Sequence, residues 1–154
     1  MDADTRRRWK DSIMRHEGLV LAVYDDATGR TVGKGDTLLG WPTIGYGRNL
    51  TGRGITKPEA DYLLHNDMAA VEAELDALIP WWKSLDQVRQ LVVAEMCFQM
   101  GSHNVVRGWP KTIDDIRSGR YAQAAVRMRQ SKWATQTKAR AYYLAGLMER
   151  GAWS

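Results

Sequence analysis

Hydrophobic residues over 57–79 recur at intervals of three and four positions, which is the spacing of one face of an α-helix. Thr56 and Glu59 stand at the start of this pattern with the spacing of a capping box. Pro80 ends the pattern, because proline cannot continue a helix. A helix of this length measures roughly 35 Å at about 1.5 Å per residue. The pattern therefore predicts a long helix that could join two lobes.

A second helical pattern begins after Ser84, with Gln87 at capping-box distance, and runs to Gly101. This segment is apolar on nearly every side, so we expect it at the centre of a helix bundle. A weaker helical pattern near the N-terminus ends at Glu17, where Gly18 provides a stop. Three further helical segments are predicted over 112–118, 121–130 and 137–150.

The pattern between the first helix and the long helix changes to short runs that are typical of strands. Residues 19–26, LVLAVYDD, are rich in β-forming residues, and glycines punctuate the segment from Gly29 to Gly54. This part predicts a small sheet of hairpins. Taken together, the patterns predict an α+β, mostly helical fold in which two lobes make up one domain. Its parts are a β lobe over about 18–56, a connecting helix over about 57–79, and a helical lobe over about 80–154 that includes the first helix.

The composition is that of a globular protein, with 44% hydrophobic and 26% charged residues in 154. The N-terminal residues lack the apolar core of a secretory signal, so we expect accumulation in the cytoplasm. Cys97 is the single cysteine and lies in an apolar run, which favours a core residue over a nucleophile. The three histidines are scattered without the spacing of metal ligands, so no metal site is predicted.

The net charge is +4, and the positive charge is concentrated in one segment. Between Ile116 and Met148 the sequence has seven basic residues and no acidic residue. Such a segment favours an anionic partner, whether nucleic acid, a membrane surface or the bacterial cell wall. A solvated helical face without any partner is an equally good interpretation.

Two carboxylates flank the first predicted strand. Hydrolysis of a glycosidic bond uses one carboxylic acid to protonate the leaving oxygen and a second carboxylate across the sugar, and Glu17 and Asp26 could form such a pair. Strand alternation places Tyr24 and Asp26 on one face and Asp25 on the other, so the adjacent aspartates should have different roles. Glutamates before a helix-stopping glycine and aspartates entering a turn are also common surface residues. The spacing alone does not decide between these interpretations.

Five segments in the same order, HEGLVLAVYDDATG, PTIGYGRN, TKPEADYLLHND, FQMG and SKWATQTKAR, resemble the phage-type lysozymes, the endolysin muramidases of glycoside hydrolase family 24. The likeness covers nearly the whole chain and implies a monomeric, lysozyme-like enzyme that needs no cofactor. It implies hydrolysis of the bond between N-acetylmuramic acid and N-acetylglucosamine in peptidoglycan by an inverting route. Such an antimicrobial enzyme would wait in the host cytoplasm until a separate pore-forming protein gives it access to the cell wall.

The resemblance also implies roles for particular residues. Glu17 matches the general acid, Asp26 the aspartate that positions or activates the attacking water, and Thr43 the threonine beside that water. This scheme needs a partly desolvated, protonated glutamate and an ionised aspartate in a wetter place. Substrate contacts are expected from four further residues, Tyr24, Trp41, Gly45 and Phe98, with Trp41 as a platform for a sugar ring.

The resemblance implies supporting roles for Arg140, Arg48 and Asp67, and Glu95 is interpreted from its own position. Arg140 matches an arginine that pairs with the catalytic glutamate. Arg48 stands where many family members have histidine, and we expect it to form a structural ion pair with Asp67. Glu95, on the apolar helix, is expected to be a paired and partly buried acid.

One departure from the family pattern lies between Asp26 and Thr43, where the predicted hairpin is longer than in compact members. Three other functions stay open. The chain could hold peptidoglycan without cutting it, or act as a lytic transglycosylase with one glutamate. It could also bind nucleic acid through a basic and aromatic group, although no nucleic acid is expected if the resemblance holds; that group is Arg127, Arg129, Lys132 and Trp133.

Overall fold

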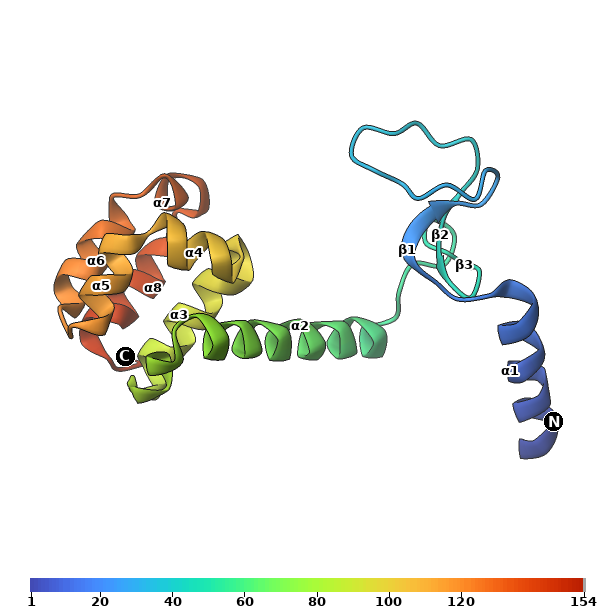
Figure 1. Ribbon diagram of the computed structural model, residues 1–154, viewed down its shortest axis with the longest axis horizontal. Coiled ribbons are helices and arrows are strands. Elements are labelled where there is room, and N and C mark those ends of the chain that lie inside the picture. The colour runs from blue at the N-terminus through green and yellow to red at the C-terminus, as the bar shows by residue number, and fades with distance from the viewer. Residues whose placement is uncertain (154) are drawn as a thin grey trace. The chain divides into compact units, whose positions relative to one another are not determined.

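The computed structural model describes residues 1–153 and divides into two compact units, Met1–Ala60 and Asp61–Ser154. The first unit carries one helix and a small antiparallel sheet, and the second is helical (Figure 1). Helix α2 (Lys57–Leu78) begins in the first unit and continues in the second. The predicted α+β, mostly helical class is confirmed. The assignment of the first helix to the helical lobe stays a prediction.

Helix α1 (Ala3–Glu17) ends where the sequence predicts. Its N-cap residue Asp2 accepts a hydrogen bond from the backbone N–H of Thr5 at 2.7 Å, which satisfies one of the free donors of the first turn. Gly18 ends the helix with a φ of +69°, a conformation that favours glycine. Glu17 therefore occupies the last helical position.

The sheet of the first unit has the order β1-β2-β3 and is antiparallel throughout. Its strands are β1 (Val20–Asp25), β2 (Pro42–Gly45) and β3 (Arg48–Asn49). The predicted long hairpin forms between β1 and β2, but its connecting segment adds no further strand. Apart from the single bridge between Tyr24 and Thr31, residues 26–41 form a loop (Figure 1). Backbone bonds such as that from the Asp26 N–H to the Trp41 carbonyl, together with bonds from the side chains of Asp25 and Asp26, satisfy the backbone at both ends of this loop.

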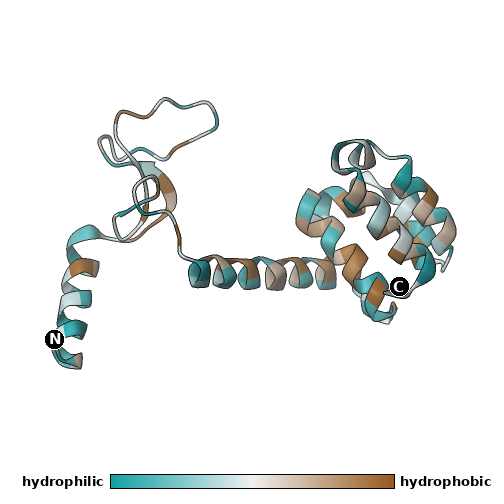
Figure 2. Cartoon of the chain, turned by 180° about the vertical axis from the view of Figure 1, so that it is seen from behind, coloured by the Kyte–Doolittle hydropathy of each residue, from teal (hydrophilic) through white to brown (hydrophobic). Residues whose placement is uncertain are grey.

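Helix α2 confirms the predicted capping box. The Glu59 carboxylate accepts hydrogen bonds from the backbone N–H of Thr56 at 2.7 Å and from the Thr56 hydroxyl at 2.8 Å. Hydrophobic and hydrophilic residues alternate along the helix (Figure 2). Pro80 opens the short 3-10 helix η1 (Pro80–Ser84) after the end of α2.

The second unit is built around helix α3 (Gln87–Met100), as the all-apolar pattern predicts. Its residues Val92, Val93, Met96 and Cys97 are at most 1% exposed. Helix α8 packs against both α3 and α6. The remaining helices are α4 (Ser102–Gly108), α5 (Pro110–Arg117), α6 (Tyr121–Arg129), α7 (Lys132–Thr137) and α8 (Ala139–Arg150).

Two predicted helix boundaries in this unit are wrong. Asp86 caps α3 by accepting a hydrogen bond from the backbone N–H of Arg89 at 3.0 Å, whereas Ser84 ends the preceding 3-10 helix. The single helix predicted over 137–150 begins only at Ala139, and Thr137 ends α7. Lys138 separates the two helices with a φ of +39°, a conformation that interrupts a right-handed helix.

Candidate active site

Glu17 lies beside the turn that joins β2 and β3. A Cβ atom at Gly47 would be 2.9 Å from Glu17 Oε2, and the φ of Gly47 is +71°. The turn therefore uses glycine for its backbone conformation and for the close approach of the carboxylate. Glu17 is exposed in its own unit, so the partial desolvation expected of a general acid stays a prediction.

The two adjacent aspartates have different environments, as strand alternation predicts. Asp25 is 5% exposed, and its carboxylate accepts backbone N–H hydrogen bonds from Leu39, Ala27 and Gly40. These bonds, with that of Leu39 contributing most, hold the pKa of Asp25 below its usual value despite burial. Asp26, the next residue, is exposed. Asp25 is therefore a structural carboxylate, and Asp26 is the one available to solvent.

The backbone of Trp41 connects Asp26 with Thr43. Its N–H donates to Asp26 Oδ1 at 2.7 Å, and its carbonyl oxygen accepts from Thr43 Oγ1 at 3.1 Å. The same carbonyl oxygen accepts from the backbone N–H of Asp26 at 3.2 Å. One peptide segment thus fixes two predicted catalytic residues relative to each other.

The predicted substrate-binding residues of the first unit lie on the same strands. Tyr24 pairs with Thr43 across β1 and β2, so their side chains share one face of the sheet. Gly45 ends β2, and no atom lies within 4 Å of the position that its Cβ would occupy. The Trp41 side chain is 56% exposed, while its backbone is fully engaged. An exposed aromatic ring on a fixed backbone is suited to stacking on a sugar.

The predicted ion pair between Arg48 and Asp67 would join the two units and stays a prediction. Within the first unit the Arg48 guanidinium donates to Glu59, which is also bound by Thr56. The capping role of Glu59 turns its carboxylate back toward the start of α2. Thr56 and then Arg48 lower the pKa of Glu59 to about 2. Asp67 lies farther along α2 and is exposed.

Three predicted residues meet in the second unit. Phe98, Glu95 and Arg140 line one pocket of about 590 Å³. Arg140 donates to Glu95 Oε2 through Nη2 at 3.2 Å and Nε at 3.3 Å, which confirms Glu95 as a paired, partly buried acid. The pairing of Arg140 with Glu17 stays a prediction.

Most arginines of the basic segment are neutralised within the second unit. Asp115, which is 4% exposed, accepts from Arg120 and Arg127, each at 2.7 Å. Arg129 pairs with Glu149 at 2.6 Å. Asp115 and Glu149, which directly precede and follow the segment, therefore provide the carboxylates that it lacks. The unpaired positive charge is smaller than the seven basic residues of the segment would give.

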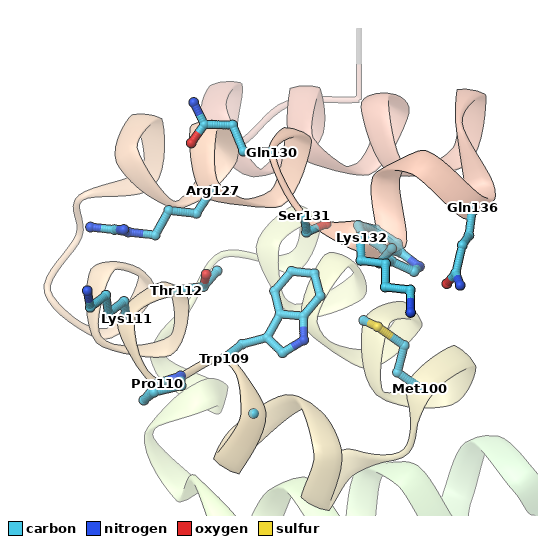
Figure 3. A pocket seen from close by; sticks show the side chains of 12 residues that line it. Met100, Trp109, Pro110, Lys111, Thr112, Arg127, Gln130, Ser131, Lys132 and Gln136 are labelled. Atoms are coloured by element: carbon cyan, nitrogen blue, oxygen red, sulfur yellow. The ribbon is translucent and has the colours of Figure 1, made fainter.

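A second pocket of about 590 Å³ lies between the start of α5 and the start of α7. Figure 3 shows the Trp109 ring in its middle, with Lys111 and Arg127 on one side and Lys132 on the other. Trp133, 5% exposed, packs against Trp109 in an edge-to-face contact with ring centroids 5.9 Å apart. None of the described residues that line this pocket carries a carboxylate. The pocket suits an anionic group and cannot supply a general acid.

Residues 1–153 give little support to a metal site or to a cysteine nucleophile. This part of the chain contains no cluster of three or more His, Cys, Asp or Glu residues that could hold a metal ion. Burial raises the pKa of the Cys97 thiol to about 11, which disfavours a thiolate nucleophile. No helix over the same residues is both long enough and apolar enough to cross a bilayer.

Sequence reasoning missed two residues that shape the site. Asp25 was separated from Asp26 but given no function, although its carboxylate holds the end of the loop next to Trp41. Gly40 is packed so closely that a Cβ atom there would lie 2.1 Å from Asp26 Oδ1. A run of two aspartates at a strand end, followed by a long segment that lacks strand alternation, is the signal that could have indicated such a clamp.

Comparison with known proteins bears on the same segments. The model of the phage lysozyme family matches residues 14–153. The chain is 30% identical over 148 residues to the pre-baseplate central spike protein Gp5 of Enterobacteria phage T4, covering 85% of this chain and 26% of that protein. It is 29% identical over 100 residues to the probable T4-type lysozyme 1 of Dictyostelium discoideum, covering 63% and 58%. It is 27% identical over 160 residues to the probable T4-type lysozyme 2 of that organism, covering 92% and 94%. The chain thus spans about a quarter of Gp5, somewhat over half of lysozyme 1 and nearly all of lysozyme 2.

Proposed function

Because this chain belongs to the phage lysozyme family, we propose that it is a peptidoglycan hydrolase that cleaves the bond between N-acetylmuramic acid and N-acetylglucosamine. The observation that carries the proposal is the backbone of Trp41, which is hydrogen-bonded to the side chains of both Asp26 and Thr43. Both residues match catalytic positions of the family. The chain covers 26% of Gp5, so the proposal concerns the matched region and not the activity of that whole protein.

The hydrogen bonds of Thr43 define how it would orient a water molecule. Its hydroxyl hydrogen points to the Trp41 carbonyl, so the hydroxyl oxygen is left to accept. Asp26 keeps Oδ2 free, because the Trp41 N–H occupies Oδ1. A water bound here donates one hydrogen to Thr43 and one to Asp26, and its lone pairs are then free to attack.

The proposed reaction is a single displacement. The water oxygen forms a bond to the anomeric carbon while the bond from that carbon to the leaving oxygen breaks. Glu17 gives its proton to the leaving oxygen, and Asp26 takes the proton from the water. The product has the inverted configuration at the anomeric carbon. Direct attack by water distinguishes this route from lytic transglycosylation, in which the sugar's own hydroxyl attacks and an anhydro product forms.

Release of reducing ends from purified peptidoglycan tests the proposal. The wild type should release them, whereas Glu17→Gln should lower the rate by at least about 100-fold, because a general acid contributes about 10² to 10⁴ in rate. Glu74→Gln is the matched control, since Glu74 is an exposed glutamate on α2 to which no role is assigned. The proposed hydrolase activity would be refuted if the wild type released no reducing ends, or if the wild type and Glu17→Gln released them at the same rate. Mass spectrometry that shows anhydro products would favour the transglycosylase.

We also propose that the hydrolase serves phage-induced lysis and acts from the host cytoplasm after a separate protein has permeabilised the membrane. Contact with an anionic wall or membrane surface would use the basic pocket around Trp109, where Lys111 and Lys132 stand without an acid at the rim. Such contacts weaken with salt. Lys111→Gln combined with Lys132→Gln should therefore lower binding to whole peptidoglycan at low salt and leave binding at high salt unchanged. Equal binding of variant and wild type at low salt would contradict this contact.

A further inference from the structure

We propose that Asp25 is a positioning residue of the hydrolytic site, whose carboxylate fixes the Gly40–Trp41 backbone and thereby the relative placement of Asp26 and Thr43. The inference deepens the proposed function and rests on it. The catalytic positions that the family resemblance implies are Glu17, Asp26 and Thr43, so none of them falls on Asp25.

The Asp25 carboxylate joins the two ends of the long loop. Oδ1 accepts from the backbone N–H of Ala27 at 3.0 Å and of Gly40 at 2.9 Å, and Oδ2 accepts from that of Leu39 at 2.8 Å. Leu39 and Gly40 follow Asp25 by 14 and 15 residues. Residues 32–41 belong to no strand, and only two backbone bonds tie them to residues 23–26, from the Val32 N–H to the Val23 carbonyl and from the Asp26 N–H to the Trp41 carbonyl. The bonds of Asp25 add to these at Leu39 and Gly40. A carboxylate that is 5% exposed is stable only with such hydrogen bonds.

The last residue bound by the Asp25 carboxylate is Gly40, which directly precedes the Trp41 backbone that connects Asp26 with Thr43. Gly40 is bound to Asp25, and Trp41 is bound through its N–H to Asp26 and through its carbonyl to Thr43. Gly40 directly precedes Trp41, so release of the Gly40 N–H frees the φ and ψ angles between them and lets the Trp41 peptide rotate. Rotation would separate Asp26 from Thr43 and misplace the water that both would hold. Asp25 itself has no contact with that water, because its oxygens are occupied by backbone donors.

Asp25→Asn tests the inference with a minimal change in size. The asparagine amide presents an NH₂ group where one backbone N–H now donates, so at least one of the three bonds must break. We expect kcat to fall about 10- to 100-fold, since a displacement of about 1 Å can cost 10²-fold in rate. KM should change less than about twofold. Amide hydrogen exchange should be faster at Leu39, Gly40 and Trp41, and this readout does not depend on activity.

A double-mutant cycle separates positioning from a general loss of folded protein. If Asp25 acts through Thr43, then Asp25→Asn should cost little further activity in a Thr43→Ala background. Effects that multiply would overturn the inference. Exchange at the amides that pair β1 with β2 tells whether the sheet is intact. An open sheet in Asp25→Asn would also overturn it, because Asp25 would then only maintain the fold.

Asp36→Asn is the matched control in the same loop. Asp36 Oδ2 accepts from the backbone N–H of Gly33 at 2.7 Å, a similar bond that ends before the segment bound to Asp26 and Thr43. This variant should keep wild-type kcat. If Glu17→Gln is inactive while Asp25→Asn keeps full activity, the positioning role of Asp25 is refuted and the proposed hydrolase activity is supported. If Glu17→Gln is as active as the wild type, the proposed function itself fails.

Discussion

Replacement of Gly40 by alanine should damage the site through a single added carbon. A Cβ atom at this position would lie 2.1 Å from Asp26 Oδ1, 2.7 Å from the backbone nitrogen of Ala27 and 2.8 Å from the Ala27 Cβ. Ordinary contacts begin near 3.4 Å, so Asp26 or the loop must move by more than about 1 Å. The Ala27 nitrogen belongs to the backbone and cannot rotate away. The clash therefore requires a shift of the chain on one side of the site.

The size of the effect follows from these distances. Overpacking of this kind costs about 1 to 3 kcal/mol of stability. A 1 Å displacement of Asp26 would lower kcat/KM by about 100-fold. Urea unfolding and release of reducing ends from peptidoglycan measure the two quantities. Gly52→Ala is the control, because the nearest atom to its Cβ would be 3.4 Å away at Asn49 Oδ1. Wild-type activity of Gly40→Ala would refute the close packing of this loop on Asp26.

Two further predictions concern stability. The folded-state pKa of Glu59 is about 2 against an ordinary value of 4.5, so its stabilising contribution is complete above pH 4.5 and disappears as the pH falls to about 2. Glu59→Gln should therefore lower the free energy of unfolding at neutral pH and approach the wild type near pH 2, and a constant difference would contradict this. Leu144 is 0% exposed, so Leu144→Ala should cost about 3 to 5 kcal/mol in urea unfolding. Tyr142 of the same helix is exposed, so Tyr142→Ala should lower the free energy of unfolding by less than about 0.5 kcal/mol. Equal losses in the two variants would contradict the burial of Leu144.

Local signals in the sequence predicted the elements whose ends they determine. Thr56 and Glu59 predicted the start of α2, and Gly18 predicted the end of α1. These predictions were possible because capping interactions involve residues only a few positions apart. The burial of α3 followed from its apolar composition. Short helices were harder to predict: α4 has seven residues, and α7 ends at Lys138, whose unusual backbone no sequence pattern indicated.

The candidate site was predictable in its residue types and less so in its contacts. Strand alternation separated Asp25 from Asp26, and the structure bears out that separation. The bonds from Leu39 and Gly40 to Asp25 span 14 and 15 residues, and periodicity carries no information about such long-range contacts. The contact between Arg48 and Glu59, which are 11 residues apart, was not predicted for the same reason.

The buried thiol of Cys97 makes the helical unit able to report its own opening. The side chain is 1% exposed, and its pKa of about 11 leaves almost no thiolate at neutral pH. A thiol reagent can therefore modify the native protein only after the core around α3 has come apart. Since the chain has one cysteine, the labelling rate follows a single event. The stability of this unit can thus be measured on the purified protein without any substrate.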